Sequence, residues 1–406
     1  MPVGVVIAGA GQGGFQVAAS LRSEGYEGSI ALIGDESCLP YQRPPLSKAI
    51  MAGKQEVEST LLRPEAFYRD HRIDLIMGER ISRIDPPNHR IQLASGARVS
   101  YRQLVLATGA RNRLLPVQGA GLDGVCYLRT RAEAIDIRQR LAGAQNIVIV
   151  GGGFIGLELA AVAISLGKQV VVVELQERLM SRVVDPIISD FYRELHLSHG
   201  VTLAFRVKTR EITGRQSRVS EVVLSDGTPY PADLVVVGIG VMPNTELAEA
   251  AGLAVANGIV VDGHMRTEDG NIYAIGDCAL HPNRFAGGAV RIESVQNAVD
   301  QARCAAASIV GRPYSYEAVP WFWTDQFDAR LQMAGLSQGC DLAVARGVPE
   351  SRKFSVLYFR QTKLLAIDSI NRPADHMAGR KLLASGTSLT PVQAADPSVD
   401  LKSLVA

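Results

Sequence analysis

Short apolar runs that lead into glycine-rich turns occur twice along the chain. The apolar runs cover residues 3–8 and 147–150, and the turns cover residues 9–14 and 151–156. An alanine- and leucine-rich stretch of helical length follows each turn, and a second apolar run follows each stretch, at residues 30–33 and 170–173. Continuous apolar runs are typical of buried parallel strands. The pattern therefore predicts two strand–helix–strand units.

Both turns have the spacing GxGxxG, with glycines at positions 9, 11 and 14 and at 151, 153 and 156. In that motif the first glycine permits a tight turn, the second lets the main chain approach a pyrophosphate, and the third allows close packing of helix and strand. The second strand of each unit leads to an acid, Asp35 or Glu174, at close to the ~20-residue separation typical of a carboxylate that binds ribose hydroxyls. Two complete units indicate two dinucleotide sites, although the glycines do not decide which nucleotide each site takes.

Beyond these units, residues 235–240 resemble a strand that ends in a loop, and apolar and polar residues alternate around Gln361-Thr362-Lys363 as in an antiparallel hairpin. A helix is expected over residues 374–384. The last residues, from Thr387, are rich in Ser, Pro and Ala and are expected to form a loosely held tail.

Composition narrows the class of protein. Of the 406 residues, 47% are hydrophobic and 20% are charged, as in globular proteins, and the formal net charge of +1 gives no overall attraction to nucleic acid or an anionic membrane. The five cysteines show neither a CxxC motif nor a spacing suited to zinc, so no metal site is expected and the cytoplasm is the expected location. The apolar run over residues 146–167 has the length of a membrane span, but its glycines fit the second nucleotide unit better.

Several further segments carry a resemblance to a known family. They are residues 39–48 (LPYQRPPLSK), 107–109 (ATG), 127–130 (YLRT), 272–277 (IYAIGD), 291–298 (RIESVQNA) and 321–326 (WFWTDQ). Over residues 3 to 385 the chain resembles the FAD-dependent NADH:ferredoxin reductases of bacterial oxygenase systems. The resemblance implies a glutathione-reductase-like α/β fold, with two Rossmann-type dinucleotide-binding domains and a C-terminal α+β domain. The implied FAD domain comprises residues 1–110 and 245–317, the NAD domain residues 111–244, and a domain that packs over the flavin residues 318–406.

The resemblance also implies the residues that bind each cofactor. The FAD set is Gly9, Gly11, Gly13, Gly14, Asp35, Arg43, Lys48, Ile81, Thr108, Arg129, Asp277, Val295 and Trp323, with Asp277 at the start of a following helix. The NAD set is Gly151, Gly153, Ile155, Gly156, Glu174, Arg182 and Gly240. Lys48, Glu158 and Trp323 are the implied catalytic residues, and the resemblance pairs Lys48 with Glu158.

Glu174 favours NADH over NADPH because its carboxylate would repel a 2′-phosphate and no arginine follows it directly. Arg178 and Arg182 lie farther along and could still reach the adenosine. The chain has no CxxxxC dithiol, so hydride taken from NADH by FAD would leave as single electrons for a 2Fe–2S ferredoxin. That ferredoxin would supply a haem-thiolate monooxygenase or a ring-hydroxylating dioxygenase. A docking patch for it is expected among Arg291, Arg303, Arg330 and Arg352.

Two other functions remain open at this level. An NADH oxidase or peroxidase would use one redox-active cysteine beside the flavin, for which Cys38 is the candidate. An FAD-binding regulatory protein, similar to apoptosis-inducing factor, would keep the fold with incidental turnover.

Overall fold

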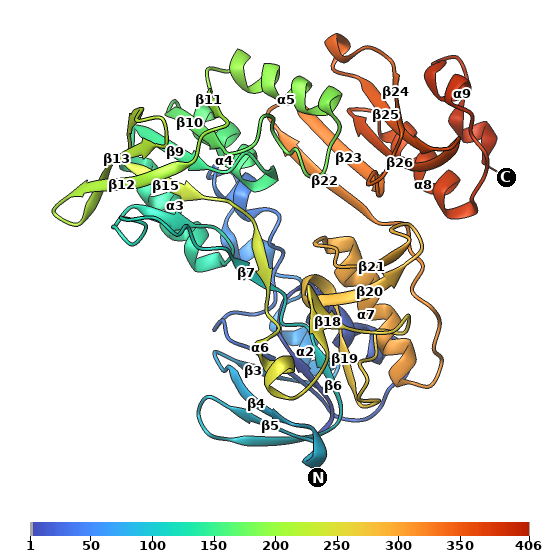
Figure 1. Ribbon diagram of the computed structural model, residues 1–406. Helices are drawn as coiled ribbons and strands as arrows, with labels where there is room; N and C mark the ends of the chain where they lie inside the picture. The colour runs from blue at the N-terminus through green and yellow to red at the C-terminus, as the bar shows by residue number, and fades with distance from the viewer. Residues whose placement is uncertain (1–2, 406) are drawn as a thin grey trace. The chain divides into compact units, whose positions relative to one another are not determined.

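The computed structural model describes residues 3–405 and divides into two compact units. The first unit comprises Met1–Gln42, Thr60–Arg111 and Met242–Phe322, and the second comprises Arg43–Ser59, Asn112–Val241 and Trp323–Ala406. Each unit is therefore assembled from three stretches that are separated in the sequence (Figure 1).

The first unit is built on a seven-stranded sheet in the order β3-β2-β1-β6-β5-β4, with β19 also paired to β6. Its strands are β1 (Val3–Ala8), β2 (Ile30–Gly34), β3 (Ile73–Met77), β4 (Ile81–Asp85), β5 (Arg90–Leu93), β6 (Arg98–Leu106) and β19 (Ile272–Ala274). The strands β3, β2, β1, β6 and β19 run parallel, and β4 and β5 are antiparallel additions. The expected first strand–helix–strand unit is present as β1, α1 (Gln12–Ser23) and β2.

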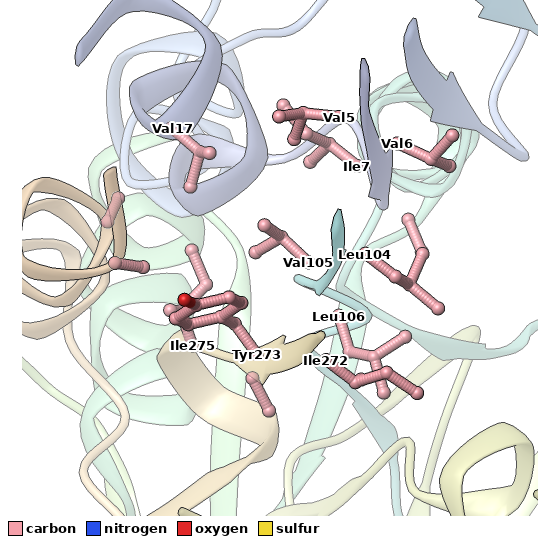
Figure 2. Packing of buried hydrophobic residues seen from close by; sticks show 14 of the residues in the cluster. Val5, Val6, Ile7, Val17, Leu104, Val105, Leu106, Ile272, Tyr273 and Ile275 are labelled. Carbon is pink, nitrogen blue, oxygen red and sulfur yellow. The ribbon is translucent and has the colours of Figure 1, made fainter. Parts of the chain in front are cut away.

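Further elements complete the first unit. They are η3 (Pro86–Asn88), α2 (Glu65–Asp70), α6 (Glu246–Ala250), η4 (Gly276–Cys278), α7 (Val295–Ile309) and a four-stranded sheet of β17 (Val255–Ala256), β18 (Gly258–Val260), β20 (Ala279–Asn283) and β21 (Gly288–Val290). Figure 2 shows the core, where Val5 and Ile7 of β1 point to the side of Val17 from α1 and Val6 points to the opposite side. Because both faces of the parallel sheet are covered, its strands are apolar at consecutive positions.

The second unit contains a parallel sheet in the order β11-β10-β9-β15-β8. Its elements are β8 (Val125–Tyr127), α3 (Arg131–Gly143), β9 (Asn146–Val150), α4 (Phe154–Ser165), β10 (Gln169–Glu174), α5 (Pro186–Ser198), β11 (Thr202–Phe205) and β15 (Leu234–Val237). The remaining elements nearby are η1 (Leu46–Ile50), a π-helical turn, η2 (Val57–Thr60), an antiparallel sheet of β12 (Thr209–Arg215), β13 (Arg218–Leu224) and β14 (Pro229–Pro231), and a two-stranded sheet of β7 (Ala110–Asn112) and β16 (Val241–Pro243). The second expected nucleotide unit is therefore β9, α4 and β10.

The C-terminal part of the second unit is an antiparallel sheet in the order β22-β23-β26-β25-β24, against which α8 packs (Figure 1). The elements are β22 (Trp321–Gln326), β23 (Ala329–Gly335), β24 (Leu342–Arg346), η5 (Pro349–Ser351), β25 (Phe354–Arg360), β26 (Lys363–Ile370), α8 (Pro373–Ser385), α9 (Pro391–Ala395) and η6 (Leu401–Leu404). The expected hairpin is confirmed, since β25 and β26 pair through a turn at Gln361 and Thr362, both with positive φ. The expected helix over residues 374–384 is confirmed as α8.

The expectation of a loosely held tail from Thr387 is wrong. Leu389, Ala394 and Leu401 are buried, and the tail forms α9 and η6. The guanidinium of Arg346, itself buried, donates to the main-chain carbonyls of Asp396 and Val399 and to two others in the segment. Composition predicted a loosely held tail, but one buried arginine from β24 and three buried apolar side chains hold the segment in place.

No helix within residues 3–405 is long and apolar enough to cross a bilayer. The apolar run over residues 146–167 is divided between β9 and α4, as its glycines indicated.

Candidate functional site

The first glycine turn has the shape of a cradle for a phosphate group. Gly9 has a φ of 116°, and a Cβ at Gly9 or Gly14 would meet main-chain oxygens at 2.2 and 1.9 Å, so both positions require glycine. A Cβ at Gly11 would instead meet nothing within 4 Å. Gly11 also begins α1 without a side-chain cap. The open position therefore lies where N–H groups at a helix N-terminus bind anions, and it fits the pyrophosphate of a dinucleotide.

Other elements of the first unit converge on this turn. A Cβ at Gly13 would lie 3.1 Å from Ile275 and 3.8 Å from Ala298, and one at Gly276 would lie 3.5 Å from the same Ala298. The Gly276 N–H donates to Gln301 of α7 at 2.7 Å. The start of α7 and the turn that carries Asp277 are thereby held beside the glycine turn.

One expectation about Asp277 is wrong. Asp277 lies in the short turn η4, which leads into β20, and α7 begins only at Val295 after a Ser294 cap. Asp277 is half-buried, and its carbonyl accepts a hydrogen bond from Arg291 at 3.0 Å. The family resemblance implied a helix start at Asp277, but the turn that carries it is stabilised from α7 by Gln301 and needs no helix of its own.

The other residues of the FAD set in this unit have different surroundings. Thr108 donates from its hydroxyl to the Asn244 carbonyl at 2.7 Å, and the Asn244 amide donates to the Thr108 carbonyl at 2.8 Å. Asp35 is exposed just beyond β2, and Val295 is half-buried at the start of α7. Ile81 is packed in the core, so any contact with a cofactor would have to come from its main chain.

The second glycine turn repeats the geometry of the first. Gly151 has a φ of 110°, and a Cβ at Gly151 or Gly156 would meet main-chain oxygens at 2.5 and 2.3 Å. A Cβ at Gly153 would meet nothing within 4 Å, and Gly153 begins α4 without a side-chain cap. Ile155, in the first turn of the helix, is exposed. The cradle fits a second pyrophosphate beside an exposed apolar side chain.

Glu174 is tied to this turn. Its Oε2 accepts the Gly152 N–H at 2.7 Å, and its Oε1 accepts the Gln176 N–H at 2.8 Å. Each carboxylate oxygen can accept a further hydrogen bond. The acid is thus fixed beside the glycine turn with acceptor capacity that suits ribose hydroxyls.

The two arginines that follow Glu174 are placed differently. Arg178 donates to the carbonyls of Val184 and Ser181 and to the Ser189 hydroxyl, at 2.6 to 2.9 Å, so its guanidinium is used within its own loop. Arg182 instead lies near the main chain of Gly240, where a Cβ would be 3.5 Å from Nη2. Arg182 and Gly240, both expected in the NAD set, are therefore neighbours.

The expected pairing of Lys48 with Glu158 is present. Lys48 Nζ lies 2.7 Å from Glu158 Oε1, and the Glu158 side chain is only 4% exposed. Ser47 and Thr324 donate their hydroxyls to the two oxygens of the same carboxylate, at 2.5 and 2.6 Å. A buried charge requires such partners, and Glu158 has one cation and two hydroxyl donors.

Arg43, Arg129 and Trp323 also belong to the second unit. Arg43 donates to the main-chain carbonyl of Arg129, whose N–H donates to Glu133 at 2.8 Å. Trp323 is half-buried on β22 and is not a core tryptophan. The structure therefore joins Arg43 to Arg129 and joins Lys48 to Glu158.

Sequence reasoning missed the residues that fix these groups. Ser47 and Thr324 lie within the RPPLSK and WFWTDQ segments, next to Lys48 and Trp323, so a hydroxyl beside an expected site residue was a signal that could have been used. Gln301 could be suspected only as a polar residue on the buried face of α7.

The four arginines of the expected docking patch all have acidic neighbours, and their role in docking stays a prediction. Each of the four arginines lies close to a carboxylate, in the pairs Arg291–Glu293 (2.6 Å), Arg303–Asp300 (3.0 Å), Arg330–Asp325 (3.6 Å) and Arg352–Asp328 (2.7 Å). The partners of the four pairs lie between two and 24 positions apart in sequence, and charge counting alone did not reveal which acids face which arginines. All five cysteines lie within residues 3–405 and none is in a disulfide bond, and Cys38 is half-buried in the loop after β2.

Comparison with known proteins places this geometry in a family. Residues 3–302 match the family model "Pyridine nucleotide-disulphide oxidoreductase", and residues 321–405 match "Reductase C-terminal". The chain is 50% identical to rhodocoxin reductase of Rhodococcus erythropolis over 99% of its length and 94% of that relative.

Two solved structures are similar over nearly their whole length. The ferredoxin reductase for the CYP199A2 system from Rhodopseudomonas palustris has a TM-score of 0.97 and 50% identity, with 100% of both chains covered. The covalent putidaredoxin reductase–putidaredoxin complex gives a TM-score of 0.97 and 41% identity, with 99% of this chain and 98% of that chain covered. With its two dinucleotide cradles and its C-terminal sheet, the chain belongs to the family of FAD-dependent, NADH-oxidising ferredoxin reductases that serve oxygenase systems.

Proposed function

We propose that this enzyme oxidises NADH and passes electrons one at a time to a 2Fe–2S ferredoxin that supplies a haem-thiolate monooxygenase or a ring-hydroxylating dioxygenase. The observation that carries the proposal is the pair of cradles, each with its middle glycine facing open space and its outer glycines against the main chain. The full-length identity to rhodocoxin reductase supports a ferredoxin as the acceptor.

We assign the first cradle to FAD and the second to NADH. Gly9, Gly11, Gly13 and Gly14 would hold the FAD pyrophosphate, with Asp35 on its ribose and Thr108, Asp277 and Val295 along the rest of the molecule. When bound, FAD supplies a carrier that accepts a hydride and releases electrons singly. The remaining residues of the proposed flavin set are Arg43, Lys48, Arg129, Trp323 and, through its main chain, Ile81.

The NADH half of the proposal rests on Glu174. Its carboxylate is fixed by Gly152 and Gln176, so it is oriented before a nucleotide arrives. A carboxylate there binds ribose hydroxyls and repels a 2′-phosphate, and Arg178 is used within its own loop. Gly151, Gly153, Ile155, Gly156, Arg182 and Gly240 would form the remaining contacts with NADH.

These assignments also suggest which part of the chain forms each domain. We propose an FAD domain of residues 1–110 and 245–317, an NAD domain of residues 111–244 and a C-terminal domain of residues 318–406 that packs over the flavin. Residues 1–2 and 406 lie outside the described part of the chain. Five cysteines outside any disulfide bond favour a reducing cytoplasm as the location.

The test mixes the purified yellow protein with NADH under anaerobic conditions, adds a 2Fe–2S ferredoxin and follows both chromophores. Rapid flavin bleaching followed by catalytic reduction of the ferredoxin is the expected result. Rapid bleaching without transfer to any of several ferredoxins, with prompt reoxidation by peroxide, would instead identify an oxidase or peroxidase. Slow bleaching with a long-lived charge-transfer band would identify a regulatory flavoprotein.

A further inference from the structure

A line of buried hydrogen bonds extends from the Lys48–Glu158 pair into the C-terminal part of the second unit. Thr324 donates to Glu158 at 2.6 Å, the Gln326 amide donates to the Thr324 hydroxyl at 3.3 Å, and the Gln326 carbonyl lies 2.9 Å from His196 Nε2. Thr324, Gln326 and His196 are each at most 1% exposed. The line joins β22, α5 and α4 without access to solvent.

All hydrogen bonds in this line point the same way. The Gln326 carbonyl can only accept, so His196 must carry its proton on Nε2. His196 Nδ1 is buried and has no hydrogen-bond partner among residues 3–405, as fits an unprotonated nitrogen. Burial lowers the pKa of His196 to about 4, so the ring is neutral at physiological pH. Each donor then points toward the Glu158 carboxylate, an arrangement in which the bonds strengthen one another.

We propose that Thr324, Gln326 and His196 are positioning residues that hold Glu158, and through it the Lys48 ammonium, in one orientation. Lys48 is 22% exposed, and its Nζ lies 2.7 Å from Glu158 Oε1, the oxygen that Thr324 also bonds. Without the Thr324 hydroxyl, Glu158 would keep the Ser47 donor on Oε2 and lose a donor on Oε1, so that oxygen and the Lys48 ammonium beside it would be held less firmly. This inference rests on the proposed role of Lys48 beside the flavin.

The line of hydrogen bonds also affects Trp323, because Thr324 is its neighbour on β22. Side chains alternate along a strand, so Thr324 and Gln326 share one buried face and the half-buried Trp323 lies on the other. The bond from Thr324 to Glu158 therefore also fixes the main chain that carries Trp323. The line sets the position of two expected site residues, Lys48 and Trp323, together.

The test compares Thr324→Val, which removes the donor at nearly constant volume, with Thr324→Ser, which keeps it. Thr209→Val is the matched control, because Thr209 is 5% exposed and its hydroxyl has no hydrogen-bond partner within residues 3–405. Three quantities are measured on the holoenzyme: the limiting rate of flavin reduction by NADH, the midpoint potential of the flavin, and the rate at which N-acetoxysuccinimide acetylates Lys48. Acetylation is followed by mass spectrometry, with the exposed Lys54 as internal reference.

In Thr324→Val we expect a limiting rate about tenfold lower and Lys48 acetylation several times faster relative to Lys54, because a hydrogen bond to a charged group is lost. The flavin potential should shift, and the dissociation constant of NADH should change little. Thr324→Ser and Thr209→Val should match the wild type in every measurement. A merely structural role would lower stability and leave the potential and the acetylation ratio unchanged, and that result overturns the proposal.

Gln326→Leu provides a second variant if Thr324→Val fails to fold. It breaks the line of hydrogen bonds one step farther from Glu158, so the same changes should appear but be smaller. Wild-type behaviour of Gln326→Leu would contradict a positioning role for Gln326 and His196. Ferredoxin reduction is assayed separately on the wild type. If the wild type fails to reduce ferredoxins while Thr324→Val still alters flavin reduction and Lys48 acetylation, the proposed function fails and the positioning role stands.

Discussion

The main-chain N–H of Gly152 donates to the Glu174 carboxylate at 2.7 Å, so the acid at the end of β10 is bonded to the glycine turn at the end of β9. A Cβ at Gly152 would lie 3.0 Å from the same carboxylate oxygen. The acid proposed to select the nucleotide and the turn proposed to hold its phosphates are thus joined by a hydrogen bond, and a substitution at either should affect both.

Glu174→Ala should raise the KM for NADH about tenfold, because a hydrogen bond from the carboxylate to a ribose is lost. The KM for NADPH should rise less than the KM for NADH, or should fall, because the repulsion between Glu174 and a 2′-phosphate also disappears. Steady-state kinetics with both nucleotides measure the ratio of kcat/KM values. Glu177→Ala, at an exposed acid paired with Arg206, is the control and should leave the ratio unchanged. An unaltered ratio in Glu174→Ala would contradict the assignment.

Gly153→Ala should weaken NADH binding without affecting folding, whereas Gly156→Ala should lower stability. The Cβ at position 153 enters open space, so the variant should fold and keep its FAD but bind NADH at least tenfold more weakly, because the main chain can no longer approach the pyrophosphate. The Cβ at position 156 meets a main-chain oxygen at 2.3 Å, so that variant should lose stability. Thermal unfolding and NADH titration measure the two effects. Equal NADH affinity in Gly153→Ala and the wild type would show that the cradle does not hold the nucleotide.

Lys48→Met should retain FAD and slow flavin reduction by NADH tenfold or more. The substitution also leaves Glu158 buried with hydroxyl donors alone, which should cost about 2 kcal/mol of stability, less than the full cost of breaking a buried pair because Lys48 is partly solvated. Lys48→Met/Glu158→Gln should recover much of the stability without the rate. Stopped-flow reduction and chemical denaturation measure both. Unchanged kinetics in the single variant would exclude a role for Lys48 in the reaction.

Arg346→Leu should release the C-terminal segment. The variant loses the donors that bind four carbonyls of the segment and leaves the buried Asp375 with Arg372 and the Ser355 hydroxyl, so a loss of about 3 kcal/mol is expected. Limited proteolysis should then cut after residue 386 faster than in the wild type. Arg352→Leu removes an exposed pair with Asp328 and should cost at most about 1 kcal/mol. Equal protease resistance in Arg346→Leu and the wild type would show that the segment is held by its apolar anchors alone.

Stability should fall in acid. Burial lowers the pKa values of His196, His281 and His376 to about 4, so each ring is neutral when folded and takes up a proton on unfolding below its ordinary value of 6.5. The stability that these neutral rings contribute is fully present above pH 6.5 and is lost as the pH falls toward 4. Between pH 7 and pH 5, each ring should lower the free energy of unfolding by about 2 kcal/mol.

Protonation of Asp368 changes the stability in the opposite direction to protonation of the histidines. Burial raises its pKa to about 7, so the folded state holds a proton that the unfolded state releases above pH 3.8, and this carboxyl adds stability as the pH falls through 7. It should offset about one histidine and leave a net loss of about 3 kcal/mol between pH 7 and pH 5. Urea denaturation at several pH values measures the curve. Asp368→Asn should make the acid limb steeper, and an identical limb would contradict the raised pKa.

Local pattern determined the two nucleotide units and the hairpin of β25 and β26. Strand, turn and helix signals depend on residues two to four positions apart, and glycine is required where the main chain takes a positive φ, as at Gly9 and Gly151. These features were therefore predicted correctly from the residues. The family resemblance added the pairing of Lys48 with Glu158, which periodicity could not supply.

Tertiary structure alone decided what surrounds those features. Thr324 reaches Glu158 across 166 positions of sequence and Ser47 reaches it across 111. Arg346 holds a segment whose composition predicted a loosely held tail, and each arginine of the expected docking patch lies close to an acid. Such contacts form because packed elements bring distant side chains together and because a buried charge must find partners. The local sequence shows which side chains each element carries, whereas the contacts between distant side chains are determined only when the sheets and helices pack.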